Sequence, residues 1–91
     1  MPDSYQEIPN ASDEELKAAL AEVDGRLLQL SLCNEAPDFV DKMLRTMSPV
    51  MANMFKDDLE YEQAQGHDEA KINDAKTKVL GLYQNYLNKQ A

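Results

Sequence analysis

The stretch KMLRTMSPVMANMF (residues 42–55) decides how this chain folds, because it sets a proline in the middle of an apolar helical pattern. The ring of Pro49 would clash with the carbonyl of Arg45, and Pro49 has no N–H to donate. Ser48 is a favourable N-cap, and proline suits the first position of a helix. We therefore predict that the helix expected over residues 38–65 is kinked or broken at Pro49.

Two further helices are expected on either side of this segment. Ser12 and Glu15 form a capping box, and apolar residues then recur at steps of three and four as far as Leu30. A similar pattern begins near Asp68, and no segment alternates as a strand would. The sequence predicts an all-α fold, an antiparallel three-helix bundle whose middle helix is kinked or broken at Pro49, with four helices if the break is complete.

The length and the cysteine content limit the organisation of the chain. Ninety-one residues suffice for one small domain. Residues 1–11 contain two prolines and no helical period, so we predict an extended N-terminal arm followed by a single domain over residues 12–91. No run is apolar enough to span a bilayer, and no secretory signal is present. Cys33, the single cysteine, agrees with a reducing compartment, so a cytoplasmic localisation is expected.

The charge of the chain restricts its partners. It carries 17 acidic and nine basic residues, which gives a net charge of −8. Acidic side chains repel phosphate backbones and anionic lipids, so we expect neither direct nucleic-acid binding nor membrane binding. A basic protein partner would be attracted.

The methionines continue an aliphatic seam, because Val40, Met47, Met54 and Tyr61 recur every seven residues. One interpretation is ordinary core packing. The other is an adaptable surface, because unbranched, polarizable side chains suit surfaces that accept varied partners. A soft-metal site made of the methionine thioethers would bind copper(I) best, but the chain shows neither an export signal nor clustered histidines, so no metal and no cofactor is predicted.

The seam is interrupted by acidic residues. The positions seven residues after Val50 and Met51 are occupied by Asp57 and Asp58, where a core would need aliphatic side chains. One interpretation is a solvated helix end. The other is an acidic patch beside an apolar groove, which would bind a basic amphipathic segment.

The second half of the first predicted helix is apolar nearly all round, so Leu28 and Leu32 must be covered. The N-terminal arm, the second helix, a second copy of the chain in a homodimer, or a different protein could cover them. The candidate partner-binding residues are therefore Met43, Met47, Met51, Met54, Asp57, Asp58, Glu60, Glu62, Leu28 and Leu32.

Signals for catalysis are weak. His67 is the only histidine and lies at a predicted turn, and Cys33 has no basic neighbour in the sequence. Residues 14–32 resemble the opening helix of the all-helical chorismate mutases, but the arginine that would bind a substrate carboxylate in that family falls at about Asn34 here. We expect no enzymatic activity and no catalytic residue.

These observations favour a small acidic, non-enzymatic interaction module of the adaptor, chaperone or inhibitor type. Its partner would be a protein with a basic or amphipathic segment. Two alternatives remain open: an acidic nucleic-acid mimic that blocks a DNA-binding protein, and a small helical enzyme or ligand-binding bundle with a pocket opened by Pro49.

Overall fold

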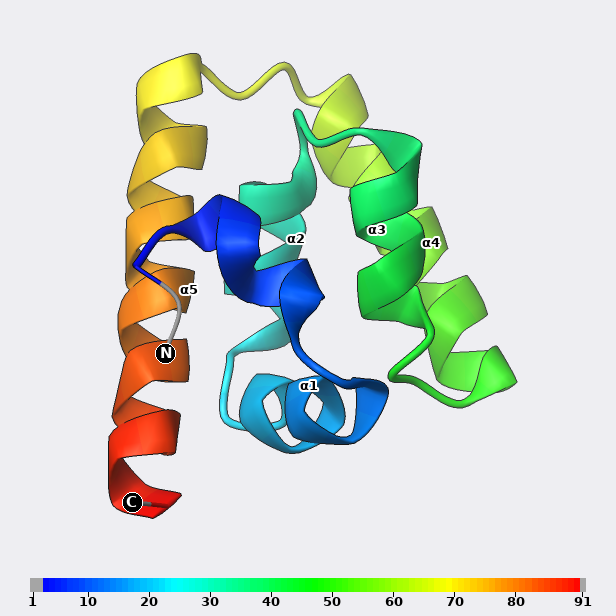
Figure 1. Cartoon of the computed structure of the whole chain (residues 1–91). Helices are drawn as coiled ribbons and strands as arrows, with labels where there is room; N and C mark the ends of the chain where they lie inside the picture. Colours follow the sequence, from blue (N-terminus) through cyan, green and yellow to red (C-terminus); the bar gives the residue numbers. More distant parts are fainter. Residues whose placement is uncertain (1–2, 91) are drawn as a thin grey trace.

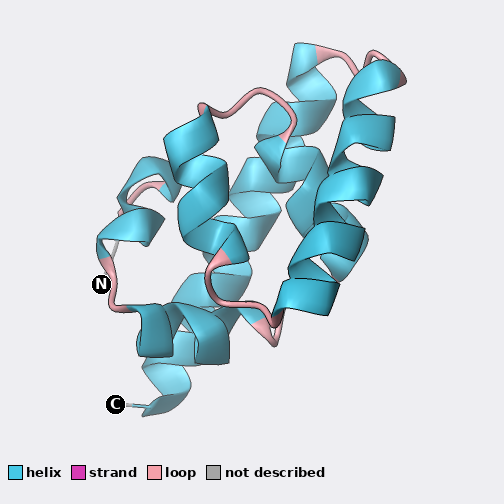
Figure 2. Ribbon diagram, turned by 90° about the vertical axis from the view of Figure 1, so that its right-hand side faces the viewer, coloured by secondary structure: helices cyan, strands magenta, loops and turns pink. Residues whose placement is uncertain are grey.

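A computed structural model describes residues 3–90 as six helices joined by short loops (Figures 1 and 2). They are the 3-10 helix η1 (Tyr5–Asn10) and the α-helices α1 (Asp13–Leu20), α2 (Gly25–Leu32), α3 (Pro37–Leu44), α4 (Pro49–Ala64) and α5 (Glu69–Gln90). The all-helical class agrees with the prediction, whereas the three-helix bundle and its four-helix version are wrong. Residues 1, 2 and 91 of the predicted arm and domain lie outside the described residues.

The first predicted helix is divided into two. Asp24 accepts a hydrogen bond from the backbone N–H of Leu27 through Oδ2, at 3.2 Å, and so caps a new helix, α2. Figure 1 shows α2 running beside α5, with α1 turned away below it. The apolar steps of three and four continue across Val23 and Asp24, and for this reason the periodicity did not reveal the break.

The break at Pro49 is complete rather than a kink. Ser48 Oγ accepts a hydrogen bond from the backbone N–H of Met51 at 3.3 Å, and Pro49 is the first residue of α4. The two resulting helices, α3 and α4, pack side by side (Figure 2). The proline therefore turns what one long helix would have been into a helical hairpin.

The N-terminal arm is folded rather than extended over Tyr5–Asn10. This 3-10 helix packs against α5 and α3, and it buries Tyr5 and Ile8. The ring of Tyr5 stacks on Phe39 with 5.1 Å between centroids. Because Ser31 donates its hydroxyl hydrogen to the carbonyl of Leu28 at 2.7 Å, the Tyr5 hydroxyl donates to Ser31 Oγ at 2.8 Å. That residues 12–91 form one domain stays a prediction.

The core is centred on α2, which lies between α5 on one side and α4 on the other (Figure 1). Leu28 is 3% exposed and Leu32 is completely buried, so the chain itself covers both leucines. The large side chains that are completely buried come from five helices; they are Ile8, Leu16, Leu32, Met43, Val79 and Tyr83.

We expect two buried tyrosines, Tyr5 and Tyr83, to make the fold sensitive to alkali. Burial is the main cause that raises the pKa of Tyr5 and of Tyr83 above the ordinary value, and the hydrogen bond that Tyr83 donates to Glu15 adds to the effect. A phenol whose pKa is higher in the folded state stabilises the fold below its unfolded pKa of about 10, and that stability is lost as the pH rises further.

We expect the melting temperature to be nearly constant from about pH 7 to 9 and to fall above about pH 10, as measured by circular dichroism. The double variant Tyr5→Phe/Tyr83→Phe should fall less steeply, because neither side chain can ionise. Tyr61→Phe is the matched control, since Tyr61 is 64% exposed. Equal slopes for the double variant and the control would contradict this explanation.

Candidate protein-binding groove

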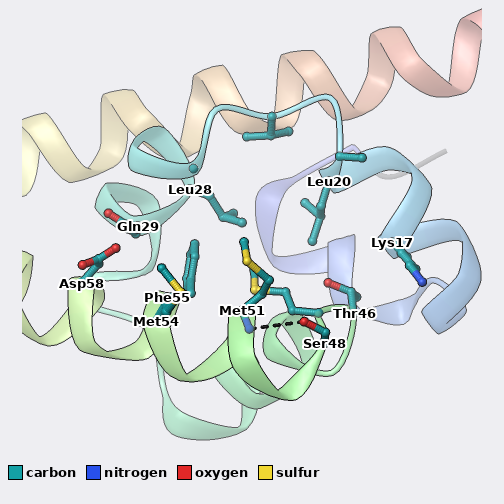
Figure 3. Close-up of a pocket in the computed structure, with 14 residues that line it drawn as sticks. Lys17, Leu20, Leu28, Gln29, Thr46, Ser48, Met51, Met54, Phe55 and Asp58 are labelled. Atoms are coloured by element: carbon teal, nitrogen blue, oxygen red, sulfur yellow. Dashed lines mark hydrogen bonds between the residues drawn. The ribbon is translucent and has the colours of Figure 1, made fainter.

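An open groove of about 410 Å³ is lined by residues of α1, α2 and α4 and of the loop before α4 (Figure 3). Leu20 and Leu28 line it from the α1 and α2 side, and Met51, Met54 and Phe55 line it from α4. Most of the lining is apolar, and the volume is within the range of roughly 300 to 1,000 Å³ that is typical of binding sites. The groove is therefore the leading candidate for a site on this chain.

The start of α4 determines which of its side chains face the groove. Ser48 and Pro49 set the first turn, and the Ser48 cap on the N–H of Met51 holds that residue at the groove (Figure 3). Met51 and Phe55 are four residues apart, so they lie on the same side of the helix. The helix break that the sequence predicted at Pro49 thus determines which side chains of α4 face the groove.

The groove has a buried floor and an exposed rim. Leu28 is 3% exposed and Phe55 is 8% exposed, so both contribute mainly to the core. Met51 is 56% exposed and Met54 is 57% exposed, although both carry large apolar side chains. These two methionines are the apolar groups that would lose most contact with water if a partner occupied the groove.

The two ends of the groove carry opposite charges. Asp58 lies at one end and Lys17 at the other (Figure 3). Among residues 3–90, neither side chain forms an ion pair or a hydrogen bond with another described group. Both charges are therefore free to pair with groups that a partner brings.

The structure brings together half of the residues that the sequence nominated. Met47, Met51, Met54, Asp58 and Leu28 all line the groove. The remaining nominated residues lie elsewhere. Met43 and Leu32 are completely buried in the core, Asp57 and Glu60 lie on the exposed surface of α4 outside the groove, and Glu62 is buried and contacts Arg26 and His67.

Glu62 has an internal structural role. Its Oε2 lies 2.6 Å from Nε2 of His67, and its Oε1 lies 3.6 Å from Nε of Arg26. These contacts join the end of α4 to α2 and to the loop before α5. The side chain is only 10% exposed, so Glu62 is not part of the surface patch that the sequence predicted.

Lys17, Leu20 and Phe55 line the groove but were not nominated from the sequence. Phe55 could have been found, because it lies four residues after Met51. Lys17 and Leu20 could not, because only the break at Asp24 turns α1 toward the start of α4. Only the tertiary arrangement shows that Lys17 and Leu20 line the groove.

Other kinds of site find little support in the described residues. No group of three or more histidine, cysteine, aspartate or glutamate side chains within residues 3–90 is arranged to hold a metal ion. Burial, helped by the nearby charge of Glu62, raises the pKa of the Cys33 thiol, which lowers its reactivity. The groove remains the feature of the described residues with the clearest binding chemistry.

Comparisons with known proteins agree on one relationship. Residues 4–90 match a family model described as "FliG C-terminal domain". Among solved structures, the chain is similar to full-length FliG from Aquifex aeolicus, with a TM-score of 0.83 and 26% sequence identity. That match covers 93% of this chain but 26% of the Aquifex chain. No curated protein gives a significant match.

Proposed function

The chain belongs to the family of FliG C-terminal domains, and from this membership we propose that it serves as the part of a flagellar rotor that meets the stator. FliG is a component of the flagellar motor switch that interacts with the stator protein MotA and with FliM, and it self-associates. The observation that carries the proposal is the family match over residues 4–90.

Family membership corrects the function expected from the sequence. The expectation of an adaptor, chaperone or inhibitor is wrong, because FliG C-terminal domains are rotor components. The two alternatives, a nucleic-acid mimic and a small helical enzyme or ligand-binding bundle, are wrong for the same reason. One broader prediction is confirmed: the domain is not an enzyme. The partners of FliG are proteins, which is the kind of partner that the sequence predicted.

FliG acts on the cytoplasmic side of the membrane-associated basal body, and we place this domain there as well. No helix within residues 3–90 is both long enough and apolar enough to cross a membrane. In this setting the domain would meet the cytoplasmic part of the stator.

The solvent side of α4 supports contact with a basic segment of the stator. Asp57, Asp58 and Glu60 are exposed there, and the same stretch carries a single lysine. Two large apolar side chains flank the acidic residues, since Val50 is 69% exposed and Tyr61 is 64% exposed. A face of this kind attracts a basic partner over a distance and retains it through apolar contact.

Charge reversal on α4 tests the proposal. We expect the double variant Asp57→Lys/Asp58→Lys to bind the cytoplasmic loop of MotA from the same organism about tenfold or more weakly at low salt, because like charges would then face one another. Fluorescence anisotropy of the labelled loop measures the affinity. The loss should shrink as salt is added, since exposed charges are screened.

The matched control is Glu69→Lys/Asp74→Lys, which makes the same change in net charge on α5. This control should keep most of the affinity, because both residues are exposed on a different helix. Equal losses in the two double variants would mean that only net charge matters. No measurable binding of the loop by the unmodified chain would overturn the proposed function.

A further inference from the structure

We propose that the groove between α4 and the α1 and α2 pair is a socket for one large apolar side chain of the partner helix, which Asp58 and Lys17 hold in a single direction. This inference rests on the proposed function, because the partner is the stator segment that approaches α4. It adds a site and a polarity that acidic steering alone does not supply.

Contacts outside the groove position α1, which forms one of its walls. Lys42 of α3 pairs with Asp13 at the start of α1, with 2.6 Å between Nζ and Oδ1. On the other side of α1, Tyr83 of α5 donates a hydrogen bond to Glu15 at 3.0 Å. These two contacts join α1 to α3 and α5 rather than to α4. A preformed site of this kind requires little ordering when a ligand binds.

The interior of the socket suits an aliphatic or aromatic side chain. Leu28 and Phe55 form its floor, and the exposed thioethers of Met51 and Met54 lie at its rim (Figure 3). Methionine side chains adjust to the shape of what they contact, because they are unbranched and polarizable. An apolar side chain that enters would cover the rim methionines and add to contacts with the floor.

The charges at the two ends determine the direction of the occupant. An amphipathic helix with a basic residue on one side of its apolar anchor can pair with Asp58, and an acidic residue on the other side can pair with Lys17. In the reverse direction both pairs would become like-charge contacts, which are unfavourable. The occupant is therefore a helix of the partner that carries base, apolar anchor and acid in order along one face.

Gly25 offers a way to block the socket without disturbing the core. It lines the groove, and a Cβ built on it meets no atom within 4 Å. Gly25→Leu would thus place a side chain in the socket at a helical position that tolerates it. Gly81→Leu is the matched control, because Gly81 lies on α5 and its Cβ is equally free of contacts.

We expect Gly25→Leu to weaken binding of the MotA cytoplasmic loop about tenfold or more, because an anchor in a pocket carries much of the affinity of such contacts. Gly81→Leu should bind as the unmodified chain does. The charge exchange Lys17→Asp/Asp58→Lys keeps the net charge and should also lose about tenfold, since it reverses the polarity of the socket.

Methyl-labelled methionine gives a direct readout by NMR. On addition of the loop, the methyl signals of Met51 and Met54 should shift and show contacts to an apolar side chain of the loop, while that of buried Met43 stays in place. If the loop binds in a manner that depends on Asp57 and Asp58 but ignores Gly25→Leu and leaves Met51 unshifted, the socket is wrong and the proposed function stands. If the loop does not bind at all, both are wrong.

Discussion

Leu32→Ala is expected to lower the free energy of unfolding by about 3 kcal/mol, within the range of roughly 2 to 5 kcal/mol found for truncation of buried leucines. Leu32 is completely buried in the core around α2. Removing its branched end leaves a cavity that the tightly packed neighbours fill only in part. For a small domain this is a large part of a total that is typically about 5 to 15 kcal/mol.

Guanidinium unfolding followed by circular dichroism measures the change. Leu82→Ala is the control, because Leu82 is 36% exposed on α5 and should cost less than about 1 kcal/mol. Leu32 was nominated from the sequence as a residue that a second copy or a partner could cover. If Leu32→Ala lowers the free energy of unfolding only slightly, and if stability depends on protein concentration, then another chain and not this core covers Leu32.

The second large effect is expected from Glu35→Ala, which should lower the free energy of unfolding by about 3 kcal/mol. Glu35 pairs with Lys76, and their side chains are only 9% and 15% exposed. Glu35 also accepts a hydrogen bond from Gln6 Nε2 at 3.0 Å. Its loss leaves the Lys76 ammonium, which lies 5.4 Å from the centre of the Tyr5 ring, without its carboxylate.

The double variant Glu35→Leu/Lys76→Met should be more stable than Glu35→Ala, because neither charge is then left buried and unpaired. Asp74→Ala is the control. It removes the exposed pair between Asp74 and Lys78, whose side chains are 64% and 63% exposed, and should change stability by less than about 0.5 kcal/mol. The buried-pair explanation is falsified if Glu35→Ala costs no more than this control.

Helix ends that depend on local chemistry were predicted well. Ser12 caps α1 and Ser48 caps α4, as the sequence indicated. Gly66, which directly follows the helix expected over residues 38–65, has φ of 70°, a left-handed conformation that glycine adopts without steric cost. The end of α1 was missed, because the apolar periodicity runs unbroken across Asp24, although the Asp24-Gly25 pair is a turn signal and Asp24 caps the new helix through its hydrogen bond from Leu27.

The candidate site was predicted in part. The nominated methionines after Pro49 line the groove, and Asp58 lies at its end. Glu62 could not be separated from Asp57 and Glu60 by sequence, because its burial depends on Arg26 and His67 arriving from other parts of the chain. Acidic residues that are close together in the sequence therefore have different roles, because only Glu62 is contacted by Arg26 and His67.

By itself, the sequence determined the helical class, the break at Pro49 and the change from apolar to acidic residues along α4. These features follow from backbone chemistry and from side-chain order within a few residues. Only the tertiary structure decided that Met43 belongs to the core whereas Met51 and Met54 border a groove. The physical reason is that the break sends α3 and α4 along different paths, so one continuous seam of methionines is divided between a surface that α2 and its neighbours cover and one left open to solvent.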